Sequence, residues 1–427
     1  MTTRKKTITI VDLFCGAGGT STGAIQAAEV LGYETNLTAV NHWERAVATH
    51  SSNHPGSRHY CVRVESLNPR DLFKEGEVDV LWGSPECTHH SRARGGKPIN
   101  DQSRATAWCV TRWAEALRPR FVMVENVPEF AEWGPTDSNG RPIPERKGEI
   151  FNAWLNTLRA LGYTVDHRVL VAANYGAGTT RRRLFTCAAL PGYDIVWPDP
   201  THSKDGSSGR PWVGADKVID WSIKGASIFN RKRPLAPNTL RRIADGLAAG
   251  GMDPSIIIME NGSRRRSVKD PLPTITTAKG GAMALAQPYL IPQHSGGAPR
   301  PVAEPVPTIA TAGAISLVEP FLVEYYGTGG SVPIADPVPT VTTRGRFALA
   351  QPVVKVDGKE YKLDILFRML KPKELAAAQG FPPDYKFTGT QEEQIKQIGN
   401  AVPCHFSKAL FLSMLTQSSD ISHLHCN

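Results

Sequence analysis

Short apolar runs rich in β-branched residues recur through the first half of the chain, and most of them end at Gly, Pro or a polar side chain. Such runs predict buried strands, and several of the stretches between them have the composition of helices. Strands that alternate with helices are typical of an open α/β sheet. The predicted strands are residues 7–11, 38–40, 78–83, 121–124 and 163–172, and the predicted helices are residues 24–31, 105–117 and 406–415.

One cysteine follows a predicted strand closely. The apolar run from Val78 stops at Gly83-Ser84-Pro85, and Cys87 comes just past it. Open α/β sheets place their chemistry at the carboxyl ends of their strands, so Cys87 is a candidate nucleophile. The alternative is a small buried hydrophobe, which is the commoner use of a single cysteine. The basic stretch that contains Arg92 and Arg94 is typical of a loop that closes over a substrate.

A glycine-rich loop follows the first predicted strand. It runs from Asp12 to Gly23, includes Gly16, Gly18 and Gly19, and leads into a predicted helix. Strand, glycine loop and helix in this order are typical of a nucleotide-binding unit, in which a ligand approaches the backbone at the helix N-terminus. Glycine turns also occur for backbone reasons alone, and the spacing here is not Gly-x-Gly-x-x-Gly.

Charged and aromatic residues follow the other predicted strands. The second strand ends near His42, Trp43 and Glu44, where dinucleotide folds hold a ribose-binding acid, and the sequence does not choose between His42 and Glu44. The Trp43 side chain would either stack on a ring of the cofactor or pack in the hydrophobic core. Glu125 comes directly after residues 121–124, where burial favours the protonated form of a carboxyl group, although a helix cap or an arginine pair would also suit it.

Two arginines alternate after the strand predicted at residues 163–172. Arg181 and Arg183 would lie on one face of an extended segment, where they suit a phosphate, a base or an acid.

The composition changes around Pro198 to a segment rich in Pro, Gly and Ser, which predicts a domain boundary. The chain is long for a single core, so we expect a domain at residues 1–197, a second at 198–366 and a closing segment at 367–427. The second domain contains Pro-x-Pro-Thr three times, at residues 271–274, 305–308 and 337–340. Three copies of a small β-unit would share one core.

The net charge of +9 is unevenly distributed. Residues 181–300 hold 18 Lys and Arg against 9 Asp and Glu, which suggests a polyanion-binding face, with a solvated surface as the alternative. Seven cysteines without a Cys-x-x-Cys pair argue against disulfides and a zinc site. No apolar run approaches the ~20 residues of a membrane span, and no signal peptide is evident, so we expect a cytoplasmic protein.

Six motifs in order resemble the cytosine-5 DNA methyltransferase family. They are residues 12–23, Pro85-Glu86-Cys87, Glu125-Asn126-Val127, Arg181 with Arg183, residues 368–381 and Gly399-Asn400-Ala401-Val402. The resemblance implies an α/β fold, with a Rossmann-like S-adenosylmethionine-dependent methyltransferase domain and a smaller, β-rich target-recognition domain. It implies double-stranded DNA as the partner, and we expect a monomer without a metal.

The resemblance also implies roles for individual residues. Cys87 would attack C6 of a flipped-out cytosine, Glu125 would bond to N3 and the 4-amino group, and Arg181 and Arg183 would hold base and acid in place. The residues implied to hold the cofactor are Asp12, Phe14, Gly16, Gly18, Gly19, His42, Trp43, Pro85, Asn400 and Val402. The residues expected to contact DNA are Arg92, Arg94, Arg264, Arg265, Arg266, Arg344 and Arg346.

The chain departs from the family pattern at several positions. Glu86 stands where the family usually has a proline, and His42 stands where it has the ribose-binding acid. The aspartate that would meet the adenine aligns with Arg63 or Val64, and Glu65 is a candidate one or two positions away. Thr179 stands where the family has a glutamine. An acid beside Cys87 disfavours the thiolate. The departures leave open an RNA substrate, a different one-carbon group or an inactive DNA-binding relative. The recognition sequence and the setting, whether restriction-modification, bacteriophage or orphan, do not follow from the sequence.

Overall fold

The computed structural model describes most of the chain, which divides into two compact units. The described residues are 6–85, 106–229, 234–236, 239–240, 243, 255–258, 264–278, 282–292, 300–301, 321–324, 331–333, 347–349, 353–356 and 359–421. The first unit comprises Met1–Val213, Pro273–Thr277 and Leu375–Asn427, and the second comprises Gly214–Leu272 and Ala278–Glu374.

The first unit is built on a seven-stranded sheet with the order β3-β2-β1-β4-β5-β7-β6. Its strands are β1 Thr7–Leu13, β2 Glu34–Val40, β3 Arg58–Tyr60, β4 Val80–Gly83, β5 Phe121–Asn126, β6 Thr164–Val171 and β7 Arg182–Ala189. The first five are parallel, and β7 runs antiparallel to both β5 and β6. The five strands predicted from apolar runs are confirmed, and so is the open α/β sheet.

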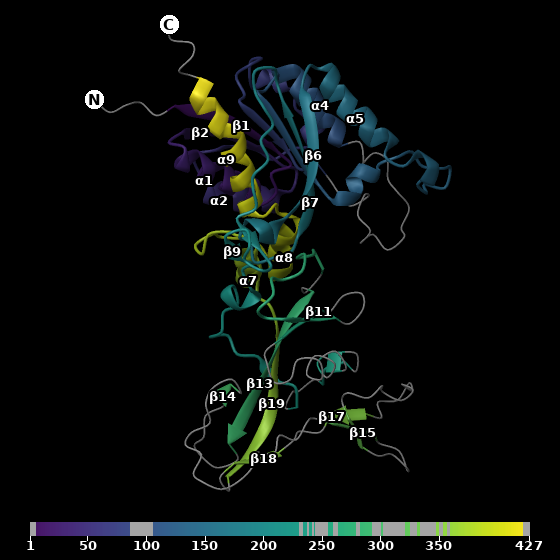
Figure 1. Cartoon of the computed structure of the whole chain (residues 1–427), viewed down its shortest axis with the longest axis vertical. Helices are drawn as coiled ribbons and strands as arrows, with labels where there is room; N and C mark the ends of the chain where they lie inside the picture. The colour runs from purple at the N-terminus through teal and green to yellow at the C-terminus, as the bar shows by residue number, and fades with distance from the viewer. Residues whose placement is uncertain are drawn as a thin grey trace, which may run out of the picture. The chain divides into compact units, whose positions relative to one another are not determined.

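Helices cover both faces of this sheet (Figure 1). The sheet is covered by α1 Gly19–Val30 and α9 Cys404–Ile421 in one core cluster and by α4 Ala107–Leu117 and α5 Glu149–Ala160 in the other. The further helices are α2 Glu44–Asn53, α7 Pro372–Ala378 and α8 Gln391–Asn400. One core cluster contains Trp113 of α4 and Trp154 of α5, and the other contains Ala24 of α1 and Phe406 of α9. Because both faces are covered, every residue of β5 is buried, which is why residues 121–124 form an unbroken apolar run before the buried polar residues Glu125 and Asn126.

Helix α1 begins at Gly19, inside the stretch that the sequence analysis expected to be a loop. The glycines at the start of α1 hide the helix from a sequence-based prediction, because glycine is a poor helix former. The structure gives the reason for them: a Cβ atom on Gly23 would lie 2.1 Å from Ser407 Oγ, so only glycine lets α9 approach this closely. Packing therefore overrides local helix propensity here.

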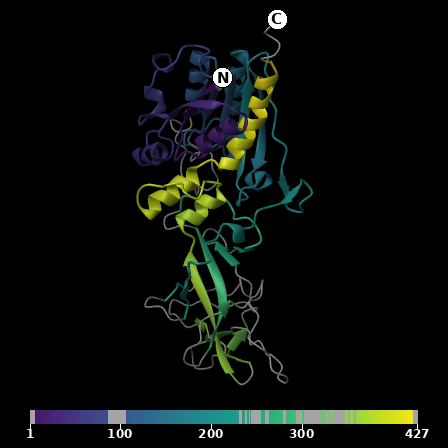
Figure 2. The same ribbon diagram turned by 90° about the vertical axis from the view of Figure 1, so that its left-hand side faces the viewer.

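The second unit is β-rich, with a long antiparallel pair formed by β13 and β19 (Figure 2). Its main strands are β10 Ala226–Ser227, β11 Ser255–Ile258, β12 Arg264–Ser267, β13 Met283–Pro292, β14 Arg300–Pro301, β18 Val353–Val356 and β19 Lys359–Met369, and a smaller sheet contains β15 Phe321–Glu324, β16 Ser331–Pro333 and β17 Phe347–Leu349. The short pair β8 His202–Ser203 and β9 Arg210–Pro211 belongs to the first unit. No helix in the described ranges has the length and apolar character needed to cross a membrane.

Candidate functional site

The sheet order places the ends of β1 and β4 side by side, at the point where the chain changes direction across the sheet. Open α/β sheets bind ligands at the carboxyl ends of the strands at such a switch point. The glycine loop follows β1, and the segment leading to Cys87 follows β4. Two predicted site elements therefore lie at neighbouring strand ends.

The loop after β1 has an unusual backbone. Phe14 adopts φ +60° although it is not glycine, and Gly16 and Gly18 have φ values of +54° and +95°. Left-handed conformations of bulky residues recur at ligand sites. Asp12, at the end of β1, is fully buried, and its Oδ1 has no hydrogen-bond partner among the described residues. Burial raises the pKa of Asp12 from 3.8 to about 7.

The C-terminal segment packs directly on this loop. A Cβ atom on Gly19 would lie 2.1 Å from the carbonyl oxygen of Val402, and the Tyr385 hydroxyl donates to the carbonyl of Ala17. Val402 is buried in the α1 and α9 core, whereas Asn400 is exposed at the end of α8. The last motif thus closes the base of the glycine loop.

The end of β2 presents one exposed and one packed side chain. His42 is exposed, and Trp43, the N-cap of α2, lies under the Lys396 ammonium group, which is 4.6 Å from the ring centroid. Part of the Trp43 ring is therefore occupied by a cation–π contact.

Glu125 and Arg183 meet at the end of β5. Arg183 Nε lies 2.8 Å from Glu125 Oε1, and the two side chains are 11% and 9% exposed. The next residue, Asn126, donates from Nδ2 to the carbonyl of Pro85 at 3.3 Å. The ion pair therefore lies one residue from the contact that joins β5 to the segment before Cys87.

Arg181 makes different contacts from Arg183. Its Nη1 donates to the carbonyl oxygen of Gly399 at 2.9 Å and to that of Ile275 at 3.4 Å, and the side chain is buried. Thr179 Oγ1 donates to the carbonyl of Pro273 at 3.0 Å. The pair predicted to act together is thus divided between the Glu125 carboxylate and the backbone of residues 273–277 and 399.

Several predicted residues lie outside the described residues. They are Cys87 and Glu86, the basic residues Arg92, Arg94, Arg344 and Arg346, and the second and third Pro-x-Pro-Thr copies. Arg264, Arg265 and Arg266 belong to β12, where Arg266 is half-buried.

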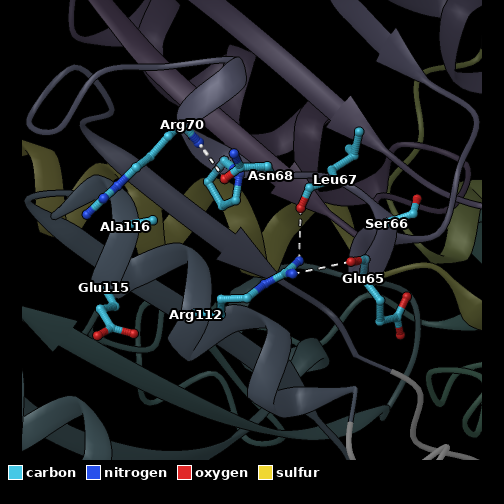
Figure 3. A pocket seen from close by; sticks show the side chains of 9 residues that line it. Glu65, Ser66, Leu67, Asn68, Arg70, Arg112, Glu115 and Ala116 are labelled. Carbon is cyan, nitrogen blue, oxygen red and sulfur yellow. Dashed lines mark hydrogen bonds between the residues drawn. The ribbon is translucent and has the colours of Figure 1, made fainter.

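The stretch that includes Glu65 lines an open cavity of about 490 Å³ (Figure 3). Arg112 of α4 donates to the carbonyls of Val64 and Leu67, each at 3.0 Å, and thereby fixes the backbone on both sides of Glu65. Burial and the Glu65 charge raise the pKa of Cys109 to about 11. The off-register candidate acid is therefore held in a defined position.

Sequence reasoning missed a cluster of histidines beneath the glycine loop. His50 Nε2 lies 2.9 Å from Ser21 Oγ, His50 Nδ1 lies 2.8 Å from His59 Nε2, and His54 Nε2 lies 3.1 Å from Thr22 Oγ1. Burial and the neighbouring histidines lower the pKa of His50 well below 6.5 and that of His54 to about 4. The one available signal was the four-residue spacing of His50 and His54 on a helix.

Comparison with known proteins gives matches at both ends of the chain. The model of the family described as C-5 cytosine-specific DNA methylase matches residues 8–209 and 325–416. The Type II methyltransferase M.AgeI of Thalassovita gelatinovora is 31% identical over 205 residues, which cover 47% of this chain and 43% of that protein. DNA (cytosine-5)-methyltransferase 1 of Gallus gallus is 27% identical over 208 residues, 45% of this chain and 12% of its own.

The fold also matches solved structures. The Entamoeba histolytica methyltransferase EhMeth superimposes with a TM-score of 0.54 at 13% identity, over 97% of this chain and 99% of that one. Identity this low supports the fold alone. The chain spans less than half the length of the two curated relatives.

Proposed function

The chain belongs to the C-5 cytosine-specific DNA methylase family, and we propose that it transfers a methyl group to C5 of cytosine in duplex DNA. The observation that carries the proposal is the Arg183–Glu125 pair at the end of β5. Strand β5 pairs in parallel with β4, the strand that leads toward Cys87. An acid supported by an arginine at this edge is what a reaction on a protonated pyrimidine ring requires.

The glycine loop fits a cationic cofactor. Asp12 Oδ1 is buried without a partner in the described part of the chain, and the positive φ values after it open the backbone to a ligand. S-adenosylmethionine, when bound, supplies a methyl group on a positively charged sulfur. Asp12, Phe14 and Gly16 to Gly19 would hold it, together with His42, Trp43 and Pro85, and Asn400 and Val402 would support the loop from below.

The protein's own residues would activate the cytosine. The Cys87 thiolate forms a bond to C6 while N3 takes a proton from Glu125, and this makes C5 electron-rich. Arg183 holds the Glu125 carboxyl group in place. Once C5 carries the methyl group, a base removes the C5 proton, the S–C6 bond breaks to return the thiolate, and N3 gives its proton back to Glu125. Because a stacked base hides C6, the cytosine must leave the duplex.

The predicted target-recognition domain would bind the DNA. We expect residues 198–366, with Arg264, Arg265 and Arg266 on β12, to contact phosphates and to read the groove. We also expect Arg92, Arg94, Arg344 and Arg346 to contact DNA.

The test is incorporation of a labelled methyl group into duplex DNA and into transfer RNA by the full chain. We expect duplex DNA to be labelled, 5-methylcytosine to appear in nucleoside mass spectra, and Cys87→Ala to abolish both. Cys61→Ala removes an exposed cysteine and is the matched control.

Trapping on DNA that contains 5-fluorocytosine separates the alternatives. A covalent complex that Cys87→Ala loses supports the mechanism. Label in RNA and none in DNA would reject the proposal in favour of an RNA substrate. A different modified base would indicate a different one-carbon group. The absence of a covalent complex would indicate an inactive DNA-binding relative.

A further inference from the structure

A chain of hydrogen bonds joins the buried Asp12 carboxyl group to a half-buried histidine on β3. Ser21 Oγ lies 2.6 Å from Asp12 Oδ2 and 2.9 Å from His50 Nε2, and His50 Nδ1 lies 2.8 Å from His59 Nε2. Asp12, Ser21 and His50 are fully buried, whereas His59 is half-buried. These hydrogen bonds thus connect the buried Asp12 carboxyl group to a more accessible side chain.

Each internal member of this chain both accepts and donates, so the whole chain has two polarities. When Asp12 is ionised, His59 Nε2–H donates to His50 Nδ1, His50 Nε2–H donates to Ser21, and Ser21 donates to Asp12. When Asp12 is protonated, every bond reverses, and His50 carries its proton on Nδ1. The tautomer of His50 therefore reports the charge of Asp12.

We propose that Asp12, Ser21, His50 and His59 form a buried proton relay, which carries one proton away from the glycine loop when a positively charged ligand binds beside Asp12. The ligand's identity as S-adenosylmethionine rests on the proposed function. Asp12 passes its proton to Ser21, Ser21 passes its own to His50 Nε2, and His50 passes the Nδ1 proton to His59 Nε2. The half-buried His59, which also hydrogen-bonds to the Ser57 backbone, then releases its Nδ1 proton to solvent. One proton leaves Asp12, and one reaches solvent.

Two features favour a relay over a static packing contact. Asp12 Oδ1 has no hydrogen-bond partner among the described residues, so one face of the carboxyl group remains for a ligand. Burial also raises the pKa of Asp12 to about 7, so a fraction of the ligand-free protein carries the proton at neutral pH. A cation at Oδ1 stabilises the carboxylate and drives that proton out.

The surroundings of the relay contain other titratable groups. They are Cys15 in the glycine loop, His54 just after α2, Cys61 after β3, Tyr385 in the C-terminal segment and Cys404 at the start of α9. Burial raises the pKa of the Cys15 thiol well above 9 and lowers that of His54 to about 4, so both are neutral near pH 7. The Cys15 and His54 side chains therefore add no charge beside Asp12 near pH 7.

Nitrogen-15 NMR of the histidine side chains, in the full chain without ligand, tests the relay directly. We expect His50 to change from the Nδ1–H to the Nε2–H tautomer as the pH rises through about 7. Asp12→Asn should remove the pH dependence, and Ser21→Ala should uncouple His50 from Asp12. His167→Gln, which changes an exposed histidine on β6, should leave the transition in place.

Calorimetry of S-adenosylmethionine binding in buffers of different ionisation enthalpy gives the second measurement. We expect release of about half a proton per cofactor near pH 7, and less for S-adenosylhomocysteine, which lacks the sulfonium charge. A single His50 tautomer at all pH values, with cofactor binding that is independent of buffer, would overturn the relay and leave the proposed function intact. A tautomer change in a protein that does not bind the cofactor would support the relay and reject the cofactor.

Discussion

Arg183 Nε lies 2.8 Å from Glu125 Oε1, with both side chains about one-tenth exposed. The register of β5 and β7 sets this contact, because Glu125 faces Phe185, which lies two residues from Arg183 on the same face of β7. Two antiparallel strands with a fixed register thus hold the Glu125 carboxylate and the Arg183 guanidinium together. A pair this well shielded from water is sensitive to the loss of either partner.

We expect Glu125→Gln to lower kcat by about 100-fold or more, because an amide N–H is too weakly acidic to transfer a proton to N3. The KM for the cofactor should change little, since Glu125 acts on the base. Arg183→Lys keeps the charge but loses the planar guanidinium, and should also reduce kcat. Steady-state methyl transfer measures both, with Arg182→Lys, an exposed neighbour, as the control. Full activity in Glu125→Gln would contradict the assigned role.

Arg181 should stabilise the first unit, because its guanidinium joins Gly399 to Ile275. Replacing it by Met removes charged donors from two buried carbonyl oxygens, and we expect the free energy of unfolding to fall by roughly 2–4 kcal/mol. Urea unfolding of Arg181→Met and of Arg182→Met provides the comparison. Equal stabilities of the two variants would show that the Arg181 contacts contribute little.

The sequence predicts five of the seven strands of the first sheet, because buried parallel strands consist of continuous apolar runs, but it does not predict β3 or β7. It does not predict how the two arginines divide. Arg181 and Arg183 have the same spacing and chemistry, and only the arrival of Ile275 and Gly399 beside Arg181 distinguishes them. Those partners lie far away in the chain, so no local pattern contains them.

The histidines beneath the glycine loop are a similar case. His50 and His54 lie outside the helices that the sequence predicts, and their burial depends on α2 packing beside the C-terminal segment that carries Tyr385. The start of α1 was missed for the opposite reason, since Gly19 and Gly23 are poor helix formers that close packing requires. Long-range packing decides both.

The stability of the protein should fall on acidification. Burial lowers the pKa of His54 and of His405 to about 4, and that of His50 well below 6.5. The folded state then binds fewer protons than the unfolded state between about pH 4 and pH 6.5, so each histidine removes up to about 1.4 kcal/mol per pH unit. Asp12 has the opposite sign, because its raised pKa means that the folded state binds more protons.

The histidines with lowered pKa values, which include His59 and His202, outnumber the one carboxyl group of opposite sign, so we expect a net loss of stability. Denaturant unfolding at about pH 7 and about pH 5 would measure it. His54→Gln should flatten the pH dependence, whereas His167→Gln should not. Unchanged stability across this range would show that the buried histidines are accessible to protons in the folded state.

The second unit should depend on a buried ion pair. Arg368 and Glu374 form two parallel hydrogen bonds, Nη1 to Oε2 at 2.8 Å and Nη2 to Oε1 at 2.7 Å, with side chains 8% and 2% exposed. Arg368 also donates to the carbonyl of Ile223 at 2.8 Å, and Glu374 accepts from the Asp220 backbone at 2.9 Å. The pair therefore joins residues 220–223 to the end of β19 and the start of α7.

Glu374→Gln leaves the Arg368 charge buried without its partner, and we expect the second unit to lose about 3–5 kcal/mol. Hydrogen exchange along β19 should accelerate and affinity for duplex DNA should fall, while calorimetric binding of S-adenosylmethionine persists, because Asp12 and the glycine loop belong to the first unit. Glu392→Gln, at the exposed start of α8, is the control. If cofactor binding fell as far as DNA binding, the two units would have to fold as one.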